Sequence, residues 1–171
     1  LDTDRVILIT GRVAREKSVD RLIRFMPEIL KQERNAKLLI VGGGPDEDDM
    51  RSLAKKMGLG DRVVVTGFID YSDMPAFYRL GEVFVTASYT EMHPLVVIEA
   101  IASGLPVVVA DDEAFKTMVE EGKNGFFCRE DDEFVSRILQ LLADEKLRRR
   151  MGKEGERIAD NFSFTAHTKG I

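Results

Sequence analysis

Two glutamates, Glu91 and Glu99, stand eight residues apart and flank the start of an apolar segment with a helical pattern. Pro94 suits the first turn of a helix, which leaves Glu91 in the preceding loop and puts Glu99 about one and a half turns into the helix. The first backbone N–H groups of a helix lack partners within it, so they form an anion site without a basic side chain. A carboxylate beside them can bind hydroxyl groups but repels a phosphate. This arrangement suits a ligand that has both diphosphate and sugar parts.

Short apolar runs alternate with helical patterns along most of the chain. Continuous β-branched runs that end at glycine, aspartate or small residues are typical of strands buried on both faces. They lie at residues 6–9, 38–41, 63–66, 83–86 and 107–110, with a weaker sixth at 125–128. Helices are predicted at residues 18–33, 46–57, 72–80, 94–103, 131–143 and 144–162. We therefore expect a Rossmann-like three-layer α/β sandwich, in which a parallel six-stranded sheet carries helices on both faces.

The predicted strand ends place the site. Open parallel sheets bind ligands beyond the carboxyl ends of their strands. Here these ends carry Gly11-Arg12, Gly42 to Pro45, Gly67-Phe68, Ser88 to Pro94 and Asp111. Because glycine and charge collect at these positions, we expect the functional site at this edge of the sheet.

Composition limits the class of protein. The 171 residues suit one domain, and a net charge of −5 argues against nucleic-acid binding, because phosphate backbones need a basic face. Cys128 is the one cysteine of the sequence, which excludes an internal disulfide and fits a reducing compartment. No apolar run approaches the roughly 18 residues that span a bilayer. The sequence starts at Leu1 without a methionine or a signal peptide, so we expect a piece of a longer polypeptide.

Three segments, in order and at the right spacing, resemble the C-terminal domain of family 4 retaining glycosyltransferases, which have the GT-B fold. Residues 91–108 resemble the family's pattern of Glu, seven residues, Glu-Ala and then Gly-x-Pro-Val. Residues 11–17 resemble its Gly-Arg-x3-Glu-Lys loop, and residues 41–45 its Val-Gly-x-Gly-Pro turn. Residues 65–68 resemble the next strand end, and the likeness covers roughly residues 5–165. It implies that residues 1–171 form a nucleotide-sugar (donor) binding domain.

The resemblance also implies a role for each matching residue. Arg12 and Lys17 would hold the diphosphate and neutralise charge on the leaving group, Glu99 would bind the ribose hydroxyls, and Glu91 would contact the donor sugar. Backbone N–H groups around residues 92–96 would hold phosphate oxygens, and backbone groups near Phe68 and Ile69 would pair with the edge of the base. The implied catalytic residues are Glu91, Arg12 and Lys17. The implied donor-binding residues are Arg12, Lys17, Gly67, Phe68, Ile69, Glu91, Met92, His93, Pro94, Leu95, Val96 and Glu99.

The same resemblance sets expectations for the reaction and its partners. The full enzyme would transfer a hexosyl group from a UDP- or GDP-sugar to an acceptor with retention of configuration, without a cofactor or a metal. The acceptor, a lipid, a polysaccharide or a small molecule, would bind an N-terminal domain absent from this chain, so the isolated domain would be inactive. We expect a cytoplasmic protein, or one peripheral at the inner membrane face, that binds no nucleic acid.

The chain departs from the family pattern at two places. Ser18 stands where the family usually has glycine, which we expect to change a helix cap and little else. Met92-His93-Pro94 replaces a frequent Gly-Phe-Gly, and Pro94 removes one N–H from the expected phosphate site.

Two other functions compete with this interpretation. An epimerase acting on a nucleotide sugar needs acid/base groups around the sugar, and beyond Glu91 and His93 the sequence offers none. A non-catalytic interaction module that kept the fold is disfavoured by the presence of Arg12, Lys17 and both glutamates together.

Local motifs also have simpler interpretations. The Gly42–Pro45 turn is not a dinucleotide fingerprint, because Glu47 stands where a third glycine is needed. The acidic runs 46–49 and 130–133 open helices, where acids favour the dipole, so we do not expect them to bind a metal. The basic residues of 146–157 alternate with glutamates and predict a solvated face of ion pairs rather than a membrane contact. Cys128 is expected to be a small core residue.

Overall fold

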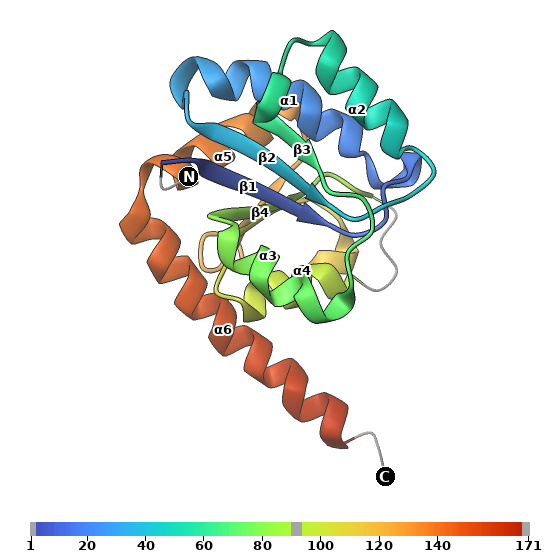
Figure 1. Cartoon of the computed structure of the whole chain (residues 1–171). Helices are drawn as coiled ribbons and strands as arrows, with labels where there is room; N and C mark the ends of the chain where they lie inside the picture. The colour runs from blue at the N-terminus through green and yellow to red at the C-terminus, as the bar shows by residue number, and fades with distance from the viewer. Residues whose placement is uncertain (1–2, 90–93, 169–171) are drawn as a thin grey trace.

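The computed structural model describes residues 3–89 and 94–168 and has the expected three-layer architecture (Figure 1). The six strands are β1 Arg5–Thr10, β2 Ala36–Val41, β3 Val63–Val65, β4 Val83–Thr86, β5 Val107–Ala110 and β6 Gly125–Cys128. They form one sheet in the order β3-β2-β1-β4-β5-β6, and each neighbouring pair is parallel. The sequence-based prediction of a parallel six-stranded sheet is confirmed.

Helices cover both faces of the sheet (Figure 1). The helices are α1 Val19–Gln32, α2 Glu47–Lys56, α3 Met74–Leu80, α4 Leu95–Ala102, α5 Asp131–Ala143 and α6 Glu145–Thr168. Helices α1, α2 and α5 lie on one side, whereas α3, α4 and the long α6 lie on the other. After β3 the chain crosses back over β2 and β1, so the strand order reverses at the neighbouring strands β1 and β4. Such a switch point opens a crevice at the carboxyl ends of these two strands.

Burial explains why the strands were predictable. Every residue of β4 and β5 is buried, and so are the last four residues of β1. A central strand with helices on both faces exposes neither set of side chains, so its sequence is continuously apolar. At the edge of the sheet, β6 is buried except at the half-buried Phe127. Its first residue packs closely on β5, since a Cβ on Gly125 would lie 2.4 Å from the carbonyl oxygen of Val107.

Two helices differ from their predicted ranges by more than one residue at an end. The predicted helix 72–80 is divided into a short 3₁₀ turn, Tyr71–Asp73, and α3, which has Pro75 in its first turn. Proline has no N–H to donate, and in the first turn of a helix that donor has no intrahelical acceptor. Helix α6 runs on to Thr168, beyond the predicted end at residue 162.

The predicted solvated basic face of α6 is wrong at Arg148. This side chain is only 11% exposed and pairs with Glu82 at 3.4 Å. It also donates hydrogen bonds to the carbonyl oxygens of Leu141 and Leu142, at 2.7 and 2.8 Å. These are terminal carbonyls of α5, which have no partner within their own helix. Arg148 therefore caps α5, whereas Arg149 forms the expected exposed ion pair with Glu145, at 2.6 Å.

The acidic runs and the cysteine lie where the sequence placed them. Residues 47–49 form the first turn of α2, and Glu130 with Glu133 forms a capping box at the start of α5. Cys128 is fully buried, and burial raises the pKa of its thiol to about 12. Over residues 3–89 and 94–168, no helix combines the length and the apolar character needed to cross a membrane.

Candidate functional site

Three loops at the carboxyl ends of β1, β2 and β3 are held together by backbone contacts. The Gly11 N–H donates to the Val41 carbonyl at 3.0 Å, and the Val13 N–H donates to the Gly43 carbonyl at 3.0 Å. Gly42 has a φ of +138°, and a Cβ there would lie 2.0 Å from the Gly11 carbonyl oxygen. Gly42 also forms a bridge to Gly67 at the end of β3. Glycine is therefore required where these loops meet, and the contact fixes the loop that carries Arg12.

A cavity of about 250 Å³ opens at the switch point between β1 and β4. Its lining includes four residues that the sequence assigned to the donor site, namely Arg12, Lys17, Leu95 and Val96. Thr10 and Thr86 contribute the ends of the two strands. The cations of the first loop thus face the first turn of α4 across one cavity. Cationic side chains opposite a helix N-terminus make an environment for an anion.

Arg12 lies on the exposed side of this cavity and pairs with Glu16 at 3.3 Å. An ion pair between exposed charges contributes little free energy, so an anionic ligand can compete for the guanidinium. Lys17 ends the short 3₁₀ turn Arg15–Lys17 and is half-buried.

Glu99 lies on α4 about one turn after Leu95 and faces a second cavity. That cavity, about 240 Å³ in volume, is lined by Tyr71, Met74, Pro75, Tyr78, Glu99, Ala102 and Ser103. Tyr71 donates a hydrogen bond to Oε1 of Glu99 at 2.9 Å, and Tyr78 lies 2.8 Å from Oε2. The structure therefore puts Glu99 beside the Arg12 cavity rather than in its lining.

The hydroxyl of Tyr78 connects the two cavities. It lies 2.9 Å from Oγ1 of Thr10, which lines the Arg12 cavity. Burial, and then the hydrogen bond to Glu99, raise the pKa of Tyr78, so this phenol stays protonated; its hydrogen bond with Thr10 acts in the opposite direction. Tyr71 is exposed, and its hydrogen bond to Glu99 raises the pKa of Tyr71 as well. Sequence reasoning missed both tyrosines: Tyr71 lies just before the predicted helix 72–80 and Tyr78 lies within it, and the short pattern gave neither residue a role.

The remaining predicted residues form three sets. Gly67 and Phe68 lie in the loop after β3, where the Phe68 side chain is 82% exposed, and Ile69 is partly buried against the core. Pro94 is buried and is the N-cap residue of α4. Glu91, Met92 and His93 lie outside the described residues, so their predicted roles stay predictions.

Arg21, on α1, anchors the segment that leads toward Glu91, and the sequence analysis did not identify it. Its guanidinium donates to Asp131 at 2.6 Å and to the carbonyl of Ala87 at 3.3 Å. It also lies 5.7 Å from the ring centroid of Tyr89 and 5.4 Å from that of Phe134. No sequence signal marks Arg21, because an arginine on an amphipathic helix normally belongs to the solvated face.

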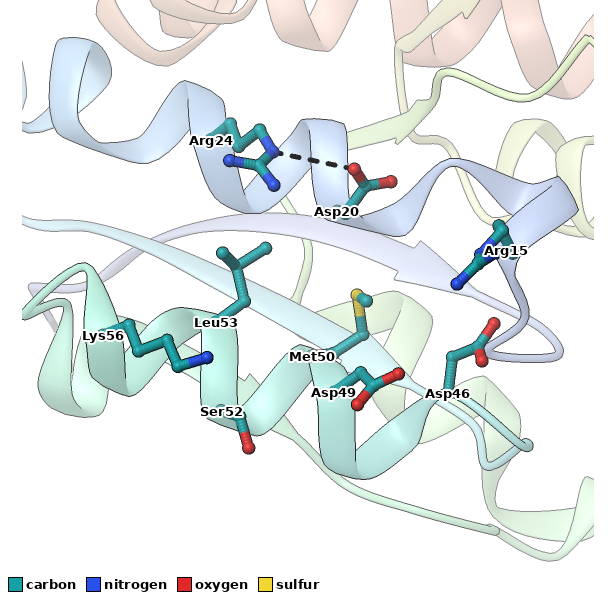
Figure 2. Close-up of a pocket in the computed structure, with 9 residues that line it drawn as sticks. All are labelled: Arg15, Asp20, Arg24, Asp46, Asp49, Met50, Ser52, Leu53 and Lys56. Atoms are coloured by element: carbon teal, nitrogen blue, oxygen red, sulfur yellow. Dashed lines mark ion pairs between the residues drawn. The ribbon is translucent and has the colours of Figure 1, made fainter.

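A separate groove of about 430 Å³ runs between α1 and α2 (Figure 2). Figure 2 shows Asp20 and Arg24 on α1 opposite Asp49 and Met50 on α2, with an Asp20–Arg24 ion pair of 3.6 Å. The groove contains none of the predicted donor-site residues. Its lining combines three carboxylates, Asp20, Asp46 and Asp49, with three cations, Arg15, Arg24 and Lys56, so it offers a diphosphate no net positive charge. Across the described ranges, no cluster of three or more His, Cys, Asp or Glu side chains is arranged to hold a metal.

The structure is a Rossmann-like α/β domain with a cavity at the switch point of its parallel sheet. The sequence belongs to the glycosyl transferases group 1 family, whose model matches residues 1–158. The resemblance seen in the sequence is thereby confirmed at the level of the family.

Individual relatives agree with this assignment. The alpha-monoglucosyldiacylglycerol synthase of Acholeplasma laidlawii is 30% identical over 151 residues, which are 88% of this chain and 38% of the synthase. The pneumococcal O-GlcNAc transferase GtfA, solved with UDP and GlcNAc, matches with a TM-score of 0.83 and 25% identity over 93% of this chain and 33% of GtfA. The C-terminal domain of a group 1 glycosyl transferase from Francisella tularensis has a TM-score of 0.81 at 23% identity, over 92% of this chain and 85% of that domain. The chain thus spans less than half the length of the curated synthase.

Proposed function

We propose that this chain is the donor-binding domain of a retaining glycosyltransferase and that it holds a nucleoside diphosphate sugar at the carboxyl edge of its sheet. The observation that carries the proposal is the cavity in which Arg12 and Lys17 face the first turn of α4. The UDP bound to GtfA, a protein of the same fold, supports the choice of ligand.

The geometry suits a leaving diphosphate. When the bond between the anomeric carbon and the diphosphate oxygen breaks, the oxygen takes the electron pair and gains negative charge. Arg12, Lys17 and the N–H groups of α4 are already in place to stabilise that charge, which helps the transition state more than the ground state. The acceptor hydroxyl, held by a domain outside this chain, then forms the new bond on the same face of the sugar, and its proton passes to the departing diphosphate oxygen.

Glu99 supplies the contact with the hydroxyl groups. Its carboxylate accepts a hydrogen bond from Tyr71, so an O–H donor already occupies the position in which we place a ribose hydroxyl. Glu91 is proposed to bind the sugar itself and, with Arg12 and Lys17, to act in the transfer.

Calorimetric titration of the 171-residue chain with UDP, GDP and ADP tests the proposal. We expect weak binding of at least one of them, and the same affinity in EDTA as in Mg²⁺, because side chains and the helix N-terminus neutralise the diphosphate. A folded sample that binds none of the three at millimolar concentration would contradict the proposal.

Arg12 and Arg15 offer a matched pair of variants, because they lie three residues apart in the loop after β1 and line different cavities. Arg12→Gln removes a cation from the strand-end cavity, whereas Arg15→Gln removes one that lines the groove between α1 and α2. We expect Arg12→Gln to weaken nucleoside diphosphate binding about tenfold, the effect of losing one charge-assisted hydrogen bond. Arg15→Gln is expected to stay within about twofold. Transfer itself is expected only from the full-length protein, measured with donor and acceptor together.

A further inference from the structure

Tyr78 is the most buried tyrosine near the two cavities that contain Arg12 and Glu99. The residue is 3% exposed, and its ring packs against Phe84 of β4 with a centroid distance of 6.4 Å. Its hydroxyl lies within hydrogen-bond distance of Oγ1 of Thr10 and Oε2 of Glu99, and 3.4 Å from the Val96 carbonyl oxygen. One phenolic group therefore touches the end of β1 and two turns of α4.

The direction of these hydrogen bonds follows from the groups involved. An ionised carboxylate only accepts, and a phenol has a single proton to donate. The proton of Tyr78 therefore goes to Glu99, at 2.8 Å, in preference to the more distant carbonyl. Thr10 then donates its own proton to the phenol oxygen, at 2.9 Å. The result is a directed chain from Thr10 through Tyr78 to Glu99.

The chain of hydrogen bonds leaves the two carboxylate oxygens of Glu99 in different situations. Oε2 is fixed by the buried Tyr78, whereas Oε1 accepts from Tyr71, a residue that is 76% exposed. An exposed hydroxyl exchanges readily with solvent or ligand hydroxyls, so Oε1 is the oxygen that a ligand can reach. Fixing one oxygen also fixes the direction of the other, because the carboxylate is planar.

We propose that Tyr78 is a positioning residue: it orients the Glu99 carboxylate so that Oε1 selects ligands with ribose hydroxyls. This inference rests on the proposed function and adds the source of selectivity for a ribonucleotide. Tyr78 also ties Glu99 to Thr10, the residue that precedes the Gly11-Arg12 loop, so the hydroxyl-binding and diphosphate-binding parts keep a fixed spacing.

The test compares UDP with its dideoxy analogue, which lacks both ribose hydroxyls, by calorimetry on the wild-type chain and on Tyr78→Phe. The wild-type chain is expected to prefer UDP about tenfold, as a hydroxyl–carboxylate hydrogen bond implies. Tyr78→Phe keeps the ring and loses only the hydroxyl, so it should lower that preference to about threefold or less. Affinity for the dideoxy analogue should stay within about twofold, because the diphosphate contacts are untouched.

Two further variants separate positioning from a general structural role. Glu99→Ala should abolish the preference, and adding Tyr78→Phe to it should change nothing more. Thr10→Val interrupts the hydrogen-bond chain from its other end and should reduce the preference about twofold even if Tyr78→Phe does not fold. A Tyr78→Phe variant that weakens both ligands equally, or one that keeps the full preference, overturns the inference while the proposed function stands. A wild-type chain that binds neither ligand removes both.

Discussion

Gly42 and Gly11 approach so closely that a Cβ on Gly42 would lie 2.0 Å from the Gly11 carbonyl oxygen. The contact joins the ends of two neighbouring strands, and a hydrogen bond from the Gly11 N–H to the Val41 carbonyl reinforces it. Arg12 follows directly. The position of the cation that we place on the diphosphate is thus set by two residues without side chains.

Replacing Gly42 should disturb this junction strongly. Gly42→Ala meets both a φ of +138° and the clash with Gly11, and should lower the free energy of unfolding by about 3 kcal/mol. Gly58→Ala is the control: its φ is +68°, but a Cβ there meets nothing within 4 Å. It should cost about 1 kcal/mol. Urea unfolding of both variants measures the difference, and equal losses would mean that the close approach is not a constraint.

Ser18 should gain stability when replaced by glycine. It has a φ of 51°, the left-handed region, and its side chain makes no cap hydrogen bond as the N-cap of α1. Ser18→Gly should therefore raise the free energy of unfolding by about 0.5–1 kcal/mol, even after the greater freedom of the unfolded chain is counted. Ser18→Ala keeps the Cβ and serves as the control, expected to remain close to wild type. If thermal unfolding shows no gain in stability for the glycine variant, the backbone of Ser18 is not strained.

Arg21 should be irreplaceable by lysine. Its planar guanidinium binds Asp131 and the Ala87 carbonyl while it lies over two aromatic rings. Arg21→Met should lower the free energy of unfolding by about 1–2 kcal/mol, since the partner Asp131 is partly solvated. Arg21→Lys should recover less than half of this loss, because an ammonium group cannot form the same fork. Full recovery in chemical denaturation would show that charge alone matters.

Cys128 should make stability fall in alkaline solution. Burial raises its pKa from 9.0 to about 12, so above pH 9 the unfolded thiol ionises while the folded thiol keeps its proton. The unfolded state then gains stability, and the free energy of unfolding falls by about 1 kcal/mol per pH unit between the two pKa values; below pH 9 the thiol has no effect. Cys128→Ala lacks this component of the slope. The free energy of unfolding of both proteins is measured from neutral to alkaline pH. If it falls equally steeply with pH in both, the raised pKa of the buried thiol is contradicted.

The strands could be predicted because burial on both faces leaves a clear apolar pattern. Val83 to Thr86 and Val107 to Ala110 are entirely buried and were found with the observed bounds. The predicted end of α6 at residue 162 was too early: residues 162–168 contain no glycine or proline that would end a helix there, and the helix continues to Thr168. Arg148 and Arg21 were not identified, because a partly buried arginine has the same sequence signal as an exposed one.

The position of the candidate site in the fold could be predicted in part. Glycine and charge at strand ends located the cavity of Arg12 and Lys17, because fold topology brings strand ends together. The second cavity around Glu99 depends on where Tyr71 and Tyr78 direct their hydroxyls, which no spacing rule specifies. The roles of Glu91, Met92 and His93 stay predictions.

The most direct test of the central claim is a crystal structure of this chain with UDP bound. The account predicts phosphate oxygens within hydrogen-bond distance of Arg12, Lys17 and the first N–H groups of α4, and a ribose hydroxyl on Glu99. Phosphates bound instead in the groove between α1 and α2, or a ribose turned away from Glu99, would contradict it.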